Sequence, residues 1–153
     1  SVHFLVNISS NNREVFSWDC RISLREMGMK GIGIDIIEIA RVERALKRHP
    51  RLLHRIFTLE EIDYCRKKKR PGASLAARFA AKEAVMKSLG LGLYSCSFQE
   101  IEILGDGQGQ PQVRLQGRAQ IRAERLGVER VIVSLSHCRS YAVAVAWAWA
   151  EGL

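Results

Sequence analysis

The chain has no apolar run of the roughly 18 residues that a membrane-spanning helix needs. Its longest apolar stretch, residues 141–150, is too short, and its alternation of bulky residues with alanine is typical of a strand. Disorder is excluded for most of the chain because 47% of its residues are apolar. A length of 153 residues suits one domain with a core of ordinary size.

Closely spaced cysteine pairs are also absent. The four cysteines are scattered along the chain and form no CxxC pair: Cys20, Cys65, Cys96 and Cys138. This spacing argues against a zinc site and against a secreted disulfide scaffold. We therefore expect buried or half-buried thiols in a protein of the reducing cytoplasm.

Several nucleotide-binding and hydrolase motifs are missing too. The chain contains no GxxxxGK[ST], HExxH or GxSxG. The stretch "GIGIDI" at 31–36 lacks the third glycine of the dinucleotide-binding fingerprint, because Ile36 stands in its place. Two glycines within a strand more often mark the close approach of another backbone, and this is the expectation here.

Residues 1–28 differ from the rest of the chain. They lack an initiator Met, a clean hydrophobic period and the layout of a signal peptide. We interpret them as an N-terminal extension or a remnant of an expression vector, with Met27 or Met29 as candidate natural starts. Residues 29–153 are expected to form a single domain.

Positive charge is concentrated in residues 41–70. This region holds eleven Lys or Arg against four acids, an excess of seven beside a net charge of +8 for the whole chain. Such a surface attracts nucleic acid, phosphorylated small molecules or an acidic protein. A merely solvated charged face is the alternative.

The hydrophobic pattern predicts an α+β fold in which helices pack on an antiparallel sheet. The expected strands are 29–36, 98–104, 112–115, 131–136 and 141–150. The expected helical segments are 38–48, a short turn at 51–57, 58–70, 75–89 and 117–127.

Local signals support some of these boundaries. Thr58 and Glu61 have the spacing of a capping box, and Pro71-Gly72 is expected to break the helix that follows them. Ser74 is the expected N-cap of the helix 75–89. In the last strand Tyr141, Trp147 and the other bulky residues should share one face, with the alanines on the other.

Asp35 interrupts the apolar run "IGIDIIEI". A carboxylate at the end of a buried strand costs several kcal/mol unless it is paired, hydrogen-bonded or bound to a metal. One interpretation is that Asp35 caps the helix beginning near residue 38. The other is that it joins a second carboxylate at Mg²⁺, which commonly takes one or two carboxylates together with water and phosphate.

The segment "RFAAKEAVMKSLG" at 78–90 carries Glu83 and Lys87 one helical turn apart, among alanines. As an ordinary i,i+4 pair they contribute about 0.3–0.5 kcal/mol. Small residues around the pair could instead leave room for a ligand. Lys82 falls within the apolar stripe of this helix, so we expect its ammonium to reach outward past a covered stem.

His137 lies in the turn between the last two strands, beside Ser136 and Arg139. It is either a structural or exposed turn residue, or a donor to a phosphate.

Taken together, these segments resemble the small bacterial holo-acyl-carrier-protein synthases, a type of 4′-phosphopantetheinyl transferase. The resemblance covers about residues 29–150. It rests on "GIGIDI", "RIFTLEEIDYC", "ARFAAKEAVMKSLG", "FQEIEIL" and "VSLSHCRSYAVA".

The resemblance implies that the arm of coenzyme A is transferred to a serine of acyl carrier protein, releasing adenosine 3′,5′-bisphosphate, in support of fatty acid biosynthesis. It implies Asp35 and Glu83 as ligands of Mg²⁺, which Mn²⁺ could replace, with Lys87 as a third catalytic residue near the pyrophosphate. The implied coenzyme A contacts are Arg78, Lys82, His137, Lys69 and Arg70. The implied contacts with the acidic carrier protein are Arg41, Arg48 and Arg51.

The resemblance further implies the 4′-phosphopantetheinyl transferase fold and a homotrimer with its sites between subunits. Two features depart from typical members: the extension 1–28, and Cys138 and Arg139 after His137. Two other functions compete with this one: a nucleic-acid-binding module on the basic region, and an inactive member that only binds the carrier. Few aromatic residues lie among the basic residues, which disfavours nucleic acid.

Overall fold

The computed structural model describes residues 5–6, 28–92, 94–105 and 109–151. It has an α+β fold with two antiparallel sheets, as predicted. The strands are β1 (Leu5–Val6), β2 (Met29–Glu38), β3 (Ile101–Gly105), β4 (Pro111–Leu115), β5 (Arg130–His137) and β6 (Tyr141–Trp149). The helices are α1 (Ile39–Arg48), α2 (Arg51–Ile56), α3 (Leu59–Arg66), α4 (Pro71–Ser88), α5 (Gly117–Arg125) and the 3₁₀ turn η1 (Phe98–Glu100).

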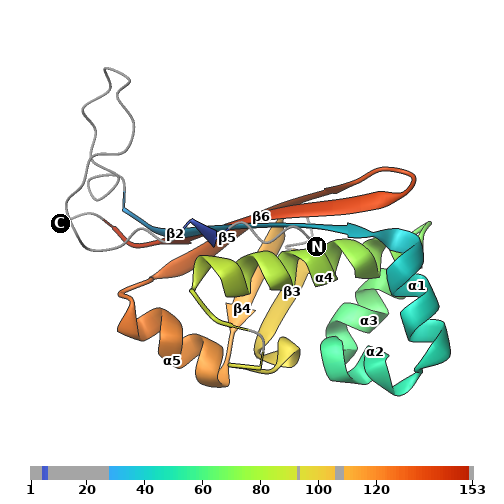
Figure 1. The fold of residues 1–153 in the computed structure, drawn as a ribbon, viewed down its shortest axis with the longest axis horizontal. Coiled ribbons are helices and arrows are strands. Elements are labelled where there is room, and N and C mark those ends of the chain that lie inside the picture. Colours follow the sequence, from blue (N-terminus) through green and yellow to red (C-terminus); the bar gives the residue numbers. More distant parts are fainter. Residues whose placement is uncertain (1–4, 7–27, 93, 106–108, 152–153) are drawn as a thin grey trace.

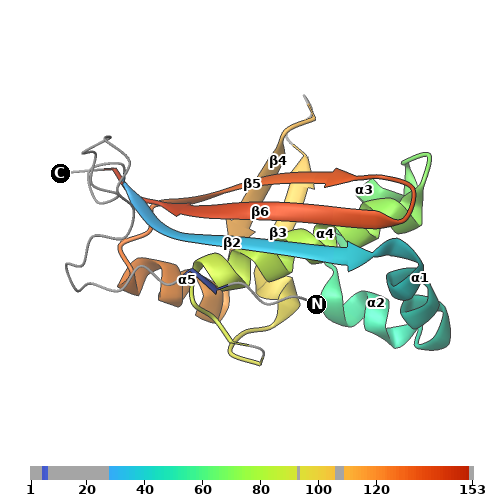
Figure 2. The ribbon, with the colours of Figure 1, turned by 45° about the horizontal axis from the view of Figure 1, so that its top comes forward.

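The larger sheet has the order β1-β2-β6-β5, and all its pairings are antiparallel. Helix α4 runs beneath this sheet, with α1, α2 and α3 grouped at one end and α5 at the other (Figure 1). Strands β3 and β4 pair with each other below the plane of the larger sheet in Figure 1, and in the tilted view of Figure 2 they cross behind β5 and β6. Among the described residues, no helix has the length and apolar character needed to cross a bilayer.

Helix α4 lies very close to strand β2. A Cβ added at Gly31 would lie 2.0 Å from the Ser88 carbonyl oxygen, and one at Gly33 would lie 2.0 Å from the Ala84 carbonyl oxygen. The expectation that these glycines mark the close approach of another backbone is confirmed.

The alanines of α4 allow a similarly close approach to the neighbouring strand β6. Ala80, Ala81 and Ala84 pack in one cluster with Ala144, Ala146 and Ala148 of β6. The interpretation that the alanines leave room for a ligand is therefore wrong: the space beside them is filled by the sheet. Small side chains let the two layers approach, and the buried area at this closely packed interface stabilises the core.

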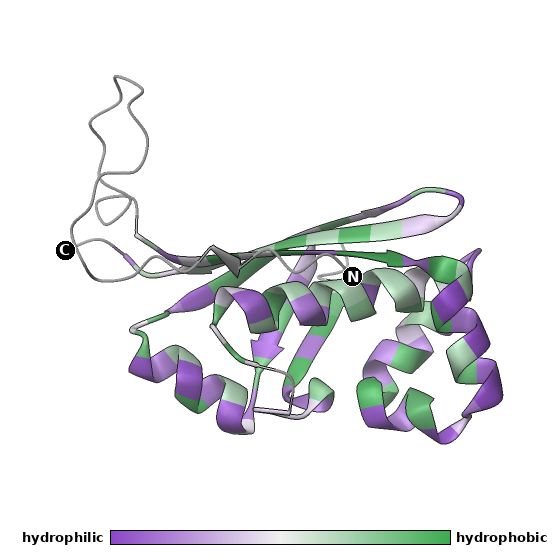
Figure 3. Cartoon of the chain, in the orientation of Figure 1, coloured by the Kyte–Doolittle hydropathy of each residue, from purple (hydrophilic) through white to green (hydrophobic). Residues whose placement is uncertain are grey.

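The opposite face of the larger sheet carries bulky apolar residues. Figure 3 shows apolar residues as green bands along the strands of this sheet. The predicted alternation in β6 is confirmed, with buried alanines on one face. The residues on the other face remain partly exposed, Ile34 at 48%, Ile132 at 40% and Trp147 at 41%. No described element covers this face, and an apolar patch of this kind marks an interaction surface.

Most predicted elements occur near their predicted bounds, but residues 98–100 form η1 and not the start of a strand, and α3 ends at Arg66 and not at residue 70. The start of α4 differs as well. The helix begins at Pro71, not after Ser74, and its N-cap residue is Arg70. Proline fits the first helical turn because its missing N–H would have no partner there and its φ is already helical. Pro71 therefore opens α4 instead of only ending the preceding helix.

The extension contributes one described element. Leu5 and Val6 pair antiparallel with Gly33 and Ile32 at the free edge of β2. The remaining residues of the extension up to Met27 lie outside the described residues, and so does Cys20.

Substituting Gly33 by Ala tests the close contact between β2 and α4. The new Cβ would meet backbone and could not be relieved by turning a side chain, so we expect the free energy of unfolding to fall by about 2–3 kcal/mol, at the upper end for overpacking. Chemical denaturation measures this loss. Gly92→Ala is the matched control, because a Cβ there would meet only Ser95 Oγ at 3.6 Å. Equal stability of the two variants would contradict the close contact.

Candidate functional site

A cleft of about 510 Å³ opens beside the end of β2, where α1, α2 and α4 meet the sheet. Asp35 of β2 and Glu83 of α4 both line it, together with Glu38, Arg41 and Tyr141. Its remaining walls are apolar and include Phe79, Leu52 and Ile56. We call it the carboxylate cleft. The fold thus brings together two of the carboxylates singled out from the sequence.

Asp35 lies inside β2 and not at the end of a strand. The N-cap of α1 is Glu38, and no side chain caps that helix, so the interpretation of Asp35 as a cap is wrong. Its side chain is 5% exposed, and its Oδ1 accepts a hydrogen bond from Lys87 Nζ at 2.9 Å. The strand reaches Glu38 because β2 stays paired with β6 up to Tyr141.

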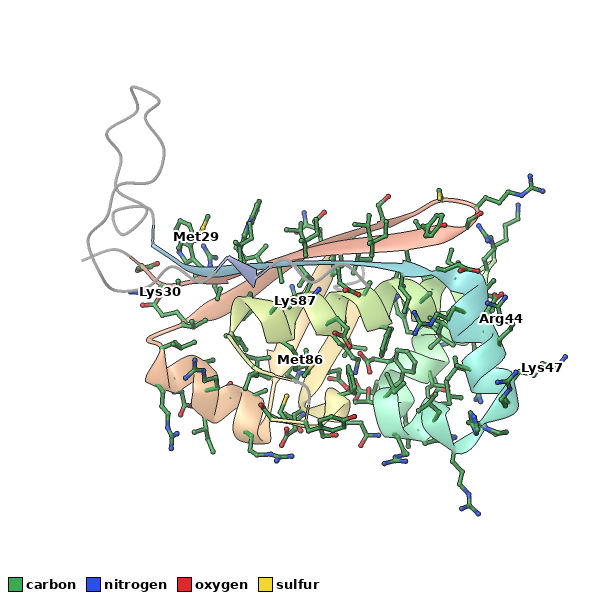
Figure 4. All side chains as sticks on the ribbon, in the orientation of Figure 1. Met29, Lys30, Arg44, Lys47, Met86 and Lys87 are labelled. Atoms are coloured by element: carbon green, nitrogen blue, oxygen red, sulfur yellow. The ribbon has the colours of Figure 1, made fainter. Side chains whose placement is uncertain are left out.

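Lys87 is held between α4 and the sheet. Its ammonium donates to Asp35 Oδ1 and to the Ile34 carbonyl oxygen, each at 2.9 Å. Figure 4 shows Lys87 on the side of α4 that faces the sheet. The residue lies behind Asp35 and does not line the carboxylate cleft. Its ion pair compensates a carboxylate that the fold has removed from water.

The donor set of the carboxylate cleft fits Mg²⁺. Mg²⁺ is typically held by one or two carboxylates and completes its shell with water and substrate phosphates. Within the described part of the chain, no group of three or more His, Cys, Asp or Glu is arranged to hold a metal. A site at Asp35 and Glu83 would therefore be of the open, two-carboxylate kind and not a closed protein cage.

A second pocket, of about 390 Å³, is lined by basic residues. We call it the basic pocket. Four of the five predicted coenzyme A contacts line it: Lys69, Arg70, Arg78 and His137. Lys68 and Tyr64 of the preceding segment line it as well.

Arg70 connects the two distant segments that form the basic pocket. Its guanidinium donates to the carbonyl oxygens of Cys138 at 3.2 Å and Arg139 at 3.0 Å. These bonds attach the turn between β5 and β6 to the start of α4. They place His137 near Arg78, although the two are far apart in sequence.

Arg78 is the buried basic residue that lines the basic pocket. It is 5% exposed, and it donates to the Ile103 carbonyl oxygen at 3.1 Å and to Ser74 Oγ at 3.1 Å. Its guanidinium carbon lies 4.3 Å from the centre of the Tyr64 ring, and Lys68 Nζ lies 4.2 Å from it. A hydrogen bond from Lys68 is the largest influence that lowers the pKa of Tyr64, and the charge of Arg78 adds to it. Sequence reasoning did not find Tyr64, because a lone tyrosine on a helix carries no specific signal.

Lys82 is in neither pocket. It is 0% exposed, and its ammonium bonds to Glu61 Oε2 at 2.7 Å and to the carbonyl oxygens of Ile56 and Phe98 at 2.9 Å. The prediction that this ammonium reaches outward is wrong, because partners inside the core take up its donors. The predicted contact between Lys82 and coenzyme A has no support in this geometry. Burial lowers the pKa of Lys82, and the charge of Glu61 opposes that effect.

The predicted carrier-binding residues Arg41, Arg48 and Arg51 are all exposed on α1 and α2. Arg41 also lines the carboxylate cleft. Arg44 and Lys47 lie on the outer side of α1 (Figure 4). The basic surface predicted from the sequence therefore adjoins the two carboxylates.

The described thiols are free. Cys65 and Cys96 are buried as predicted, and burial raises the pKa of both. Cys138 is exposed, so the expectation of a buried or half-buried thiol is wrong there. Backbone N–H groups of Ser140 and Tyr141 lower the pKa of Cys138.

Residues 31–146 match the sequence pattern of the 4′-phosphopantetheinyl transferase superfamily. This match spans most of the chain and includes Asp35, Glu83 and the residues of both pockets. The chain belongs to this superfamily. The resemblance to this family and the predicted α+β fold are confirmed.

Individual members of the superfamily agree with the match. The holo-[acyl-carrier-protein] synthase of Moorella thermoacetica is 63% identical over 114 residues, which are 74% of this chain and 89% of that one. The crystal structure of holo-[acyl-carrier-protein] synthase from Neisseria meningitidis has a TM-score of 0.71 at 34% identity, covering 78% of this chain and 98% of that one. The Bacillus anthracis synthase in complex with coenzyme A (3′,5′-ADP) has a TM-score of 0.65 at 34% identity, covering 80% and 97%.

Removing the partner of Asp35 tests the pairing at the cleft. In Lys87→Met the buried carboxylate loses its counter-charge, so we expect the free energy of unfolding to fall by about 3 kcal/mol. Denaturant titration measures it. The double variant Asp35→Asn/Lys87→Met should regain much of this loss, because no buried charge is left unpaired. Lys30→Met, at an exposed position of the same strand, is the control. A Lys87→Met variant as stable as this control would refute the pairing.

Proposed function

We propose that this protein is a holo-acyl-carrier-protein synthase that serves fatty acid biosynthesis. It transfers the 4′-phosphopantetheine arm of coenzyme A to a serine hydroxyl of apo acyl carrier protein and releases adenosine 3′,5′-bisphosphate. The observation that carries this proposal is the meeting of Asp35 and Glu83 in one cleft beside a basic helix surface. The high identity to a holo-[acyl-carrier-protein] synthase over most of the chain supports it.

Asp35 and Glu83 are the proposed ligands of Mg²⁺, with Mn²⁺ as a substitute because both ions favour oxygen ligands. Mg²⁺ held there would neutralise charge on the pyrophosphate of coenzyme A, in which the bond between the pantetheine-side phosphorus and the bridging oxygen breaks. Lys87 supports this site from behind. Its bond to Asp35 fixes the direction of that carboxylate, so this geometry favours a positioning role over direct contact with the leaving phosphate.

The basic pocket is the proposed site for the phosphates of coenzyme A. Arg78, Arg70 and Lys69 supply fixed positive charge, and His137 adds an imidazole N–H donor. Tyr64 offers an aromatic face in the same pocket. Lys82 is left out of this proposal, because its ammonium is sealed inside the core.

Arg41, Arg48 and Arg51 are the proposed contacts with the carrier protein. Their exposure on α1 and α2 fits the docking of an acidic surface, and Arg41 stands where that surface would meet the carboxylate cleft. Electrostatic attraction of this kind speeds encounter and weakens with salt. A cytoplasmic location is part of the proposal and is consistent with the free thiols of Cys65, Cys96 and Cys138.

A homotrimer with active sites between subunits is also proposed. The carboxylate cleft and the basic pocket have no lining residue in common. A coenzyme A molecule that contacts the basic pocket of one subunit and the carboxylate cleft of another would explain this separation. The uncovered apolar face of β2, β5 and β6 is a suitable surface for association between copies of the chain.

The transfer reaction tests the proposed function directly. Purified protein is incubated with apo carrier, coenzyme A and Mg²⁺, and mass spectrometry should show the carrier gaining one phosphopantetheine arm. Asp35→Ala and Glu83→Ala should each lower kcat/KM at least ~100-fold, since a metal supplies several kcal/mol of charge stabilisation. Chelation by EDTA should stop the reaction, and added Mg²⁺ should restore it.

Glu129→Ala removes an exposed carboxylate far from the cleft in sequence and is the matched control. Absence of transfer by the unaltered protein, with a carrier that another synthase can load, would refute the function. Steeply salt-dependent nucleic-acid binding together with that absence would favour a nucleic-acid-binding module instead. Full activity of either alanine variant would refute only the metal assignment.

The proposed homotrimer, with the exposed sheet face as its contact surface, gives a prediction for the assembly state. We expect the unaltered protein to sediment as a trimer, and Trp147→Lys to shift it toward the monomer, because a charge would be buried at the interface. Sedimentation velocity measures both. Ile121→Lys, on a similarly exposed apolar residue of α5, should leave the trimer intact. A stable monomer of the unaltered protein at assay concentration would rule out the trimer.

A further inference from the structure

A pair of opposite charges lies in the core, outside both pockets. Lys82 and Glu61 are each 0% exposed, and Lys82 Nζ lies 2.7 Å from Glu61 Oε2. Two charges removed from water gain little net stability from their attraction, and well-packed apolar residues often serve as well or better. Stability alone is therefore a weak explanation for this pair.

The Lys82 ammonium joins α4 to three other segments. It donates to the carbonyl oxygen of Ile56 at the end of α2, to that of Phe98 at the start of η1, and to Glu61 in α3. Hydrogen bonds depend on direction as well as distance. Three bonds to separate segments therefore restrict both the rotation of α4 about its axis and its position along that axis.

Apolar packing restricts α4 in a different way. Towards the sheet, α4 presents small side chains such as Ala80 and Ala84, which pack against the alanines of β6. This close packing limits how near α4 comes to the sheet, whereas the burial of apolar surface has no preferred direction and the hydrogen bonds of Lys82 do. Two ion pairs add this directional restriction to the packing: Lys87 with Asp35 on the sheet side, and Lys82 with Glu61 on the helical side.

Backbone groups also hold the Glu61 carboxylate in place, independently of Lys82. Its Oε1 accepts from the Ile103 N–H at 2.8 Å, and its Oε2 accepts from the Thr58 N–H at 2.9 Å as part of the capping box. The Thr58 hydroxyl in turn donates to Glu102 at 2.7 Å. An anchor already bound by backbone groups sets a defined position for the lysine that pairs with it.

The residue after Lys82 is Glu83, which lines the carboxylate cleft. The Ile56 residue that accepts from Lys82 lines the same cleft from α2. A displacement of Lys82 would thus move Glu83 and the α2 wall relative to each other. Catalytic geometry is sensitive to shifts of this kind, because misplacement of about 1 Å can cost about 100-fold in rate.

We propose that the buried Lys82–Glu61 pair is a positioning device that sets Glu83 in the carboxylate cleft. The proposal rests on the proposed function, in which Glu83 helps to hold Mg²⁺. Neither Lys82 nor Glu61 touches a substrate, and both act through Glu83.

The double variant Glu61→Gln/Lys82→Met tests the device without leaving a buried charge unpaired. The introduced glutamine keeps an acceptor for the Ile103 N–H, and the introduced methionine fills the volume of the lysine stem. At a temperature where thermal unfolding shows the variant to be folded, we expect kcat to fall at least about tenfold, the signature of lost transition-state geometry. The Mg²⁺ concentration for half-maximal rate should rise at least about fivefold, because weakened orientation of ligands lowers metal affinity by about 10–100-fold.

Binding of Mn²⁺ to the protein alone, measured by electron paramagnetic resonance, supplies a readout that does not depend on transfer. It should weaken in parallel with the Mg²⁺ requirement, while KM for the carrier stays within about twofold, because the carrier surface on α1 is untouched. Val131→Ala is the control for lost stability: it creates a cavity in β5 at a residue that lines neither pocket, and should leave kcat and Mn²⁺ binding unchanged.

A folded double variant with the kcat and Mn²⁺ affinity of the unaltered protein would overturn the proposal and leave the pair a purely structural one. If the double variant does not fold, Thr58→Val tests the same device more gently, since it removes the hydroxyl that bonds the Glu61 N–H and Glu102. Its Mn²⁺ affinity should fall, and an unchanged affinity would count against the device. If the unaltered protein performs no transfer, the proposed function fails, and the Mn²⁺ titrations still decide the positioning of Glu83.

Discussion

The close contact between helix α4 and strand β2 is the constraint on which the rest of the structure depends. Gly33 has no side chain, so the Ala84 carbonyl oxygen can occupy the space that a Cβ would need. This approach brings Lys87 to 2.9 Å from Asp35, and so makes it possible to bury a carboxylate in the middle of a strand. With a wider separation the carboxylate would stay unpaired in the core, at a cost of several kcal/mol.

The four charged side chains of α4 lie in four different environments. Arg78 lines the basic pocket, Lys82 is buried among the helices, Glu83 lines the carboxylate cleft, and Lys87 faces the sheet. Successive residues of a helix point about 100° apart, so neighbours such as Lys82 and Glu83 can have unlike surroundings. The chemistry of the proposed site therefore depends on how accurately α4 is placed, which explains why ion pairs fix it on two sides.

Much of the fold could be predicted from the sequence, because local patterns carry that information. The strand at 29–36 and the helix at 38–48 were predicted close to their observed bounds, and so was the capping box of Thr58 and Glu61. The predictions that failed concern neighbours. The small residues of α4 indicated open space, but a second layer of alanines from β6 fills it. Asp35 was placed at the end of a strand, because the continued pairing of β2 with β6 has no local signal.

The sequence by itself determined which chemical groups are present and how they alternate along each element. It determined the two carboxylates, the basic region, the glycines of β2 and the two-faced last strand. Tertiary structure alone decided which partner each charged group takes. Lys87 pairs with a residue 52 positions away, and Lys82 with one 21 positions away. Such pairs form only when packed layers bring distant segments within hydrogen-bond distance, and the spacing of residues along a chain does not set the distance between layers.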